Sequence, residues 1–148
     1  MPSDDTPKDV SVESRVAAPG EVRALLDAAA RFRRDAALDG ASLEARYLMA
    51  YESALMLATV ALRTAEIRIK GRDNHRDTFR LLSAVIGDEV AAYAEFFDDV
   101  RRRRNRVQYD GALVSGSREL AETLRRLDEF REIVARWLAD QGVGTASA

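Results

Sequence analysis

The feature that most constrains the fold is a long apolar stretch, residues 42–67, whose apolar side chains cover most of the circumference of a helix. These side chains include Leu43, Tyr47, Ala50, Leu55, Leu57, Ala58 and Leu62. A helix that is apolar nearly all round is buried among other elements. Glu52, Thr59 and Arg63 interrupt the stretch, so the pattern indicates a core helix and not a membrane span. We therefore expect a central helix that begins after an N-cap at Ser42.

Four further segments show the 3.6-residue periodicity of amphipathic helices. They cover residues 21–38, 78–86, 88–109 and 117–141. The alternation of β-branched residues that marks strands is almost absent. Short connections favour antiparallel packing of neighbouring helices. The sequence thus predicts an all-α fold, an up-down bundle of four long helices with one short helix.

The chain has 148 residues, the size of one domain, and we assign the helical bundle to residues 19–141. Residues 1–18 are polar and acidic and lack the apolar middle of a signal peptide. We expect this segment and the tail, residues 142–148, to be disordered. These features are typical of a cytoplasmic protein without membrane contact.

The composition limits the chemistry that the chain can perform. It contains no cysteine and one histidine, His75, which excludes disulfides, a thiol nucleophile and a histidine-rich metal cluster. We therefore expect no metal and no cofactor. The formal net charge is −2, so any binding of nucleic acid must come from a local basic patch.

One such patch is the run RRRRNR at residues 101–106. On a helix with about 100° per residue, Arg104 falls in the apolar seam between Val100 and Val107, whereas Arg102 and Arg106 point to the opposite side. Removing an arginine from water is costly unless it is paired and hydrogen-bonded. The run therefore predicts a solvated face and one arginine in need of a partner.

Several partners would satisfy Arg104. A carboxylate is one, and Glu52, on the otherwise apolar stretch, is the candidate. A subunit interface and a ligand phosphate are the others. The simpler alternative is that the apolar seam ends early and that the side chain of Arg104 extends to water.

The run also carries a motif. Arg104 and Asn105 are followed four residues later by Tyr109, at the end of a long helix that comes after an apolar helix, a basic loop containing His75 and a short helix. Over about residues 20–140 this arrangement resembles the HEPN domain, a helical family of prokaryotic toxin–antitoxin, phage-defence and RNA-processing systems. The family motif is an arginine, often an asparagine, and a histidine after four to six intervening residues.

The resemblance implies a homodimer in which the arginine motifs of the two subunits face each other across a basic cleft. Active members cut RNA without a metal, and their histidine and arginine act on the 2′-hydroxyl and the scissile phosphate. The resemblance also implies partners of two kinds, a cognate antitoxin or a nucleotidyltransferase-like protein.

The chain departs from the family at Tyr109, which stands in place of the histidine. A phenol with a pKa of about 10 is a poor general base at neutral pH. We therefore predict a dimeric domain that binds RNA, a nucleotide or a protein partner without robust catalysis. The alternative is a metal-independent ribonuclease, a toxin, whose catalytic residues are Arg104, Asn105 and Tyr109. A third possibility is a structural dimer in which the arginines supply interface charge.

The candidate residues for contact with RNA or phosphate lie in the arginine run and in the basic loop before the short helix. They are Arg101, Arg104, Arg68, Arg72, Arg76 and His75. His75 is also a candidate substitute for the missing histidine. A solvated basic segment explains the loop equally well.

Overall fold

The computed structural model of the chain describes residues 10–70, 74–110 and 116–143, and of residue 74 and residues 106–110 it describes the backbone alone. Five α-helices, one 3₁₀ turn and two short strands make up this part of the chain. In chain order they are β1 (Val12–Ser14), α1 (Glu21–Ala36), α2 (Leu43–Thr64), β2 (Ile67–Ile69), α3 (Asn74–Val85), η1 (Asp88–Val90), α4 (Ala91–Asp110) and α5 (Ser117–Asp140). The fold is mostly helical, as the sequence predicts.

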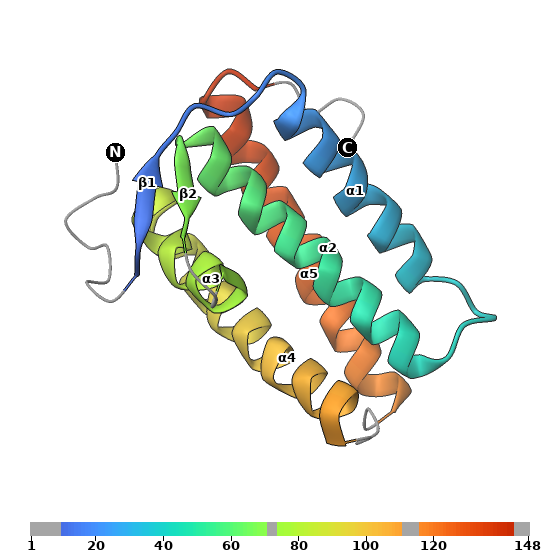
Figure 1. The fold of residues 1–148 in the computed structure, drawn as a ribbon. Coiled ribbons are helices and arrows are strands. Elements are labelled where there is room, and N and C mark those ends of the chain that lie inside the picture. Colours follow the sequence, from blue (N-terminus) through green and yellow to red (C-terminus); the bar gives the residue numbers. More distant parts are fainter. Residues whose placement is uncertain (1–9, 71–73, 111–115, 144–148) are drawn as a thin grey trace.

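Helix α2 lies at the centre of the molecule (Figure 1). It packs against α1, α3, α4 and α5, which explains why its apolar residues cover nearly every face. The predicted N-cap is confirmed, because the Ser42 hydroxyl accepts a hydrogen bond from the backbone N–H of Ala45 at 3.1 Å. A buried hydrogen bond of 2.8 Å from the Ser53 hydroxyl to the carbonyl of Ala29 also ties α2 to α1.

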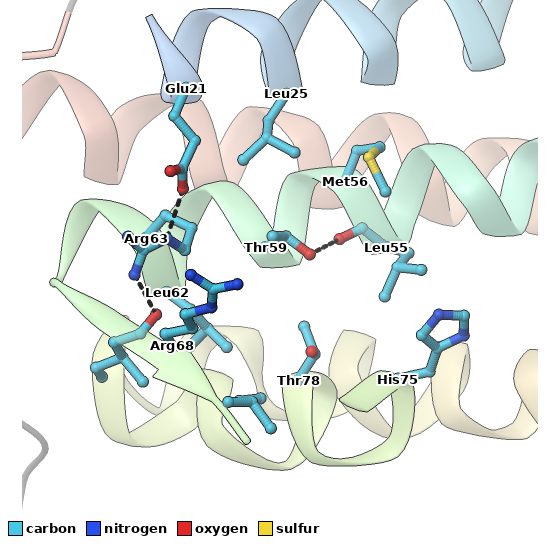
Figure 2. Close-up of a pocket in the computed structure, with 12 residues that line it drawn as sticks. Glu21, Leu25, Leu55, Met56, Thr59, Leu62, Arg63, Arg68, His75 and Thr78 are labelled. Carbon is cyan, nitrogen blue, oxygen red and sulfur yellow. Dashed lines mark hydrogen bonds and ion pairs between the residues drawn. The ribbon is translucent and has the colours of Figure 1, made fainter. Parts of the chain in front are cut away.

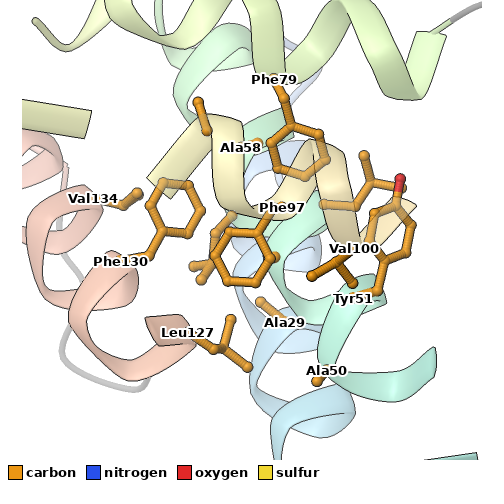
Figure 3. Close-up of a cluster of buried hydrophobic side chains, with 14 of the residues drawn as sticks. Ala29, Ala50, Tyr51, Ala58, Phe79, Phe97, Val100, Leu127, Phe130 and Val134 are labelled. Carbon is orange, nitrogen blue, oxygen red and sulfur yellow. The ribbon is translucent and has the colours of Figure 1, made fainter. Parts of the chain in front are cut away.

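An aromatic cluster fills the space between α2, α3, α4 and α5 (Figure 3). Phe97 of α4 lies at its centre, with ring centroids 5.6 Å from Phe130 and 6.2 Å from Phe79. Tyr51 of α2 is also part of the cluster, and its ring centroid lies 6.1 Å from that of Phe79. All four rings are buried. Such contacts hold the helices at fixed positions, because large aromatic side chains bury much area in defined geometries.

The structure corrects the sequence analysis at the N-terminal segment and at the end of α2. Strand β1 lies within the segment 1–18 that we expected to be disordered, and β2 lies where we expected the last turn of the central helix and the loop after it. The two strands pair antiparallel, with Glu13 opposite Arg68. The physical reason is a second apolar cluster, in which Val10 and Ile67 pack on Leu81.

The turn after α2 explains why this helix ends at Thr64, before the predicted end at residue 67. Glu66 has a φ of 63°, in the left-handed region that non-glycine residues rarely adopt. Its carbonyl accepts a 2.7 Å hydrogen bond from the N–H of Arg15, which holds the turn against the strand segment. The chain thus leaves the helix after Thr64 and enters β2.

The third and fourth helices also differ from the predicted bounds. Helix α3 begins at Asn74, four residues before the predicted start at residue 78, so His75 lies in its first turn and not in a loop. The entry to α4 is the 3₁₀ turn η1, which follows Gly87 with a φ of 120°. Among the helices of the described residues, none has both the length and the apolar character that crossing a bilayer requires.

Candidate functional site

The arginine run lies on α4, and its first three members are held by carboxylates. Arg101 donates a 2.8 Å hydrogen bond to Asp98, and Arg102 donates one of 2.7 Å to the same side chain. Arg103 pairs with Glu119 of α5. Arg102 is 61% exposed, which confirms that it belongs to the solvated face. The side chain of Arg106 is outside the described residues.

Arg104 differs from its neighbours in both burial and bonding. Its side chain is 19% exposed, which confirms that it lies in the seam formed with the buried Val100. The guanidinium contacts Glu52 with an Nη2–Oε1 distance of 3.5 Å, so the predicted pair is confirmed, but at the length of a weak contact. Its Cζ atom lies 5.4 Å from the centroid of the Tyr51 ring, within cation–π range.

Tyr51 packs beneath Arg104, and the two residues with Glu52 form what we call the Arg104 site. Its side chain is fully buried, and its hydroxyl has no hydrogen-bond partner among the described residues. Burial is the main cause that raises the pKa of Tyr51 well above its usual value, and the charge of Arg104 only partly opposes it. The phenol therefore stays protonated and keeps an unused donor beneath the Arg104 guanidinium.

His75, on α3, lies near the same Tyr51 ring. The centroids of the His75 and Tyr51 rings are 6.1 Å apart. His75 remains exposed to solvent, but partial burial of its ring lowers its pKa, the charges of Arg104 and Arg101 lower it further, and Glu52 acts in the opposite direction. The lowered pKa favours the neutral form of the imidazole.

The site thus combines residues of α2, α3 and α4. Arg104 and His75, far apart in the sequence, both contact the ring of Tyr51, and Glu52 lies beside them. A phosphate would find guanidinium donors here, and a hydroxyl proton would find a neutral imidazole. The same geometry also serves as a purely structural contact between three helices.

The remaining candidate residues are dispersed. Asn105 follows Arg104 on α4 and is partly buried, whereas the side chain of Tyr109 is outside the described residues, as is all of Arg72. Arg76 of α3 donates a 3.3 Å hydrogen bond to Asp77. Arg68 lies on β2 and lines a separate pocket that shares His75 with the Arg104 site.

Sequence reasoning missed two parts of the site. The burial of Tyr51 follows from its place on the apolar stretch of α2, but its contact with Arg104 does not. The spacing of Asp98 three residues before Arg101 and four before Arg102 was a readable signal for ion pairs on one helix face. Within residues 10–70, 74–110 and 116–143, no three acidic, histidine or cysteine side chains gather as metal ligands would.

Comparison with known proteins adds no identification. Protein-family models, curated proteins and solved structures were all compared with the chain, and no match was found. Any function must therefore be argued from the residues and their geometry.

Proposed function

We propose that this chain is a HEPN-like domain that binds RNA through its phosphates at the Arg104 site and lacks robust catalysis. The long helices α1, α2, α4 and α5 would then form the up-down four-helix bundle of that family. The homodimer would place two Arg104 sites on either side of a shared cleft. The family resemblance of the motif and the arrangement of charges on α4 support this proposal.

The observation that carries the proposal is the incomplete pairing of Arg104. Its only ion pair among the described residues is the 3.5 Å contact with Glu52, whereas Arg101 and Arg102 form contacts of 2.8 and 2.7 Å with Asp98. A guanidinium has five N–H donors, and one long contact leaves most of them available. A phosphate with its charged oxygens would satisfy them far better.

The local charge balance limits the strength of such binding. Four arginines, residues 101–104, face four carboxylates, Asp98, Asp99, Glu119 and Glu52. The patch is therefore close to neutral, and long-range attraction of RNA is weak. A bound phosphate would compete with Glu52 for Arg104, so binding depends on local contacts more than on overall charge.

This competition gives the test a distinctive form. Binding of a fluorescently labelled single-stranded RNA would be measured by anisotropy, without divalent metal, for the wild type and three variants. Arg104→Ala should weaken binding by about tenfold or more, because a charge-assisted contact is lost. Glu52→Gln should strengthen binding by about threefold, because it keeps the shape and removes the competing charge.

The matched control is Arg102→Ala, which removes the same charge two residues away, on the exposed face of α4. It should change the affinity by less than about twofold. Equal losses for Arg102→Ala and Arg104→Ala would indicate non-specific attraction. No binding by the wild type, with Glu52→Gln also inactive, would make Arg104 a structural residue.

A second function has one observation in its favour, the position of His75. The family mechanism needs a base for the 2′-hydroxyl, and a neutral imidazole that shares the Tyr51 ring with Arg104 could supply it. In that ribonuclease, the 2′-oxygen attacks phosphorus, the bond to the 5′-oxygen breaks, and a cyclic phosphate and a 5′-hydroxyl result. The 2′-proton passes to His75, a water molecule protonates the leaving 5′-oxygen, and the resulting hydroxide takes the proton back from His75.

The two functions are separated by His75→Gln. Metal-independent cleavage that His75→Gln abolishes, with RNA affinity retained, would establish the ribonuclease. Binding without any cleavage in the wild type supports the proposed binding function.

A further inference from the structure

A pocket of about 440 Å³ lies between the start of α1, the second half of α2, strand β2 and the start of α3 (Figure 2). Its volume is within the range of roughly 300–1,000 Å³ that is typical of small-molecule sites. Half of its lining residues are apolar, namely Leu25, Leu55, Met56, Leu62, Ile67 and Ile69. The pocket therefore suits a ligand with an apolar body.

The charged residues that line the pocket are two arginines, Arg63 and Arg68, and one carboxylate, Glu21. Arg63 donates a 2.5 Å hydrogen bond to Glu21, and this contact lowers the pKa of Glu21, so the two form an ionised, mutually neutral pair. Arg68 is different, since it forms no ion pair among the described residues. Its cross-strand neighbour Glu13 pairs with Arg15 and Lys70 instead.

Figure 2 shows the Arg68 guanidinium turned toward the space between Thr59 and Thr78, with the ring of His75 at the far side. The hydroxyl of Thr59 donates its proton to the carbonyl of Leu55 at 2.7 Å. Its oxygen therefore faces the pocket as an acceptor only. The pocket thus carries one net positive charge, on Arg68, above an apolar wall.

We propose that this pocket binds a small amphipathic organic anion, with a carboxylate on Arg68 and a hydrocarbon body against Leu55, Met56 and Leu62. A planar guanidinium binds a carboxylate through two parallel hydrogen bonds, which fixes the orientation of the ligand. The aliphatic walls then bury the body of the ligand. This site is separate from the proposed RNA contact at Arg104, with His75 as the residue common to both.

The test uses three probes with the same eight-carbon body and different head groups, octanoate, 1-octanol and octylammonium. Binding to the full chain would be followed by calorimetry and by shifts of backbone NMR signals. Octanoate should bind, should shift the signals of β2 and of the second half of α2, and should bind about tenfold more tightly than 1-octanol. Octylammonium should bind more weakly still, because its charge repels Arg68.

Two variants assign the contacts. Arg68→Gln lies on an exposed strand position and leaves the apolar core intact, and it should remove the preference of the pocket for octanoate over 1-octanol. Arg131→Gln, a change at an exposed position of α5, is the matched control and should have no effect. Arg104→Ala should also leave octanoate binding unchanged, which separates this site from the proposed function.

Three outcomes would overturn the proposal. One is the absence of octanoate binding up to about 10 mM, a concentration at which even very weak sites fill. Another is equal affinity for octanoate and 1-octanol, which would remove the role of Arg68. The third is a set of NMR shifts that lies outside the pocket.

Discussion

Arg63 and Arg104 are two arginines with largely buried side chains, and they differ in how many hydrogen bonds and ion pairs their guanidinium groups form. The Arg63 side chain is 9% exposed and donates to the Glu21 carboxylate, to the carbonyl of Arg15 and to the carbonyl of Ile67, at 2.5, 3.1 and 3.0 Å. Arg104 is 19% exposed and has one carboxylate at 3.5 Å and one aromatic ring.

Completeness of hydrogen bonding separates a structural arginine from a candidate binding residue. Arg63 joins α1, the N-terminal segment and β2 through three hydrogen bonds within the chain. Arg104 lies over the ring of Tyr51, whose buried hydroxyl has no partner among the described residues, so its surroundings are incompletely bonded. Buried polar groups are normally satisfied, and exceptions are frequent at functional sites.

The largest expected effect is on stability, at Arg63. Arg63→Ala should lower the free energy of unfolding by about 2–4 kcal/mol, because it breaks a largely buried ion pair and leaves two carbonyls without their donor. Urea denaturation followed by circular dichroism measures this change. The control is Arg136→Ala, which breaks an exposed pair with Glu89 and should cost less than about 0.5 kcal/mol. Similar costs for both variants would contradict the structural role of Arg63.

A smaller change in the free energy of unfolding, of opposite sign, is expected at Tyr51, beneath Arg104. Tyr51→Phe removes a buried hydroxyl without a partner and keeps the ring contacts with Phe79 and His75. We expect the free energy of unfolding to rise by about 1 kcal/mol. Thermal and urea denaturation both report it. A loss of stability would mean that the hydroxyl is satisfied, and the site would then be as complete as that of Arg63.

Arg104 itself should contribute little to stability. Arg104→Ala should change the free energy of unfolding by less than about 1 kcal/mol, because its ion pair with Glu52 is long and the Arg104 side chain is one-fifth exposed to solvent. The same urea denaturation experiment compares the free energy of unfolding of this variant with that of Arg63→Ala. A loss as large as that of Arg63→Ala would show that both arginines are structural.

The smallest effect is the pH dependence due to His75, the only histidine in the sequence. Its folded-state pKa is lowered below the ordinary value of 6.5, so the unfolded chain binds more protons between the two values. Stability from this group is present above pH 6.5 and is lost as the pH falls through that window. Denaturation of the wild type and of His75→Gln at a series of pH values should give a flatter profile for the variant. Identical profiles would mean that neither partial burial nor the charge of Arg104 changes the pKa of His75.

The sequence predicted the helices well because they depend on apolar periodicity. The central position of α2 followed from its apolar circumference, and the place of Arg104 in the seam followed from its spacing to Val100. The pair with Glu52 also followed, since few charged residues interrupt α2 and an arginine in the core needs a counter-charge.

The parts that sequence reasoning missed depend on contacts between distant segments. Strands β1 and β2 have three residues each, too few for alternation to stand out, and they form because Val10 and Ile67 share an apolar cluster. The approach of His75 to the Tyr51 ring depends on how α3 crosses α2, which no local pattern encodes.

The role of Arg104 as the RNA contact is tested most directly by comparing the guanidinium groups of Arg63 and Arg104 in one NMR experiment. The Nε–Hε signals of the arginines would be followed during titration with a short single-stranded RNA, with Arg104→Lys used to assign the Arg104 signal. We expect the Arg104 signal to shift as RNA binds, whereas the Arg63 signal stays in place because its Nε–H donates to Glu21. RNA binding with an unchanged Arg104 signal would move the binding surface away from this arginine.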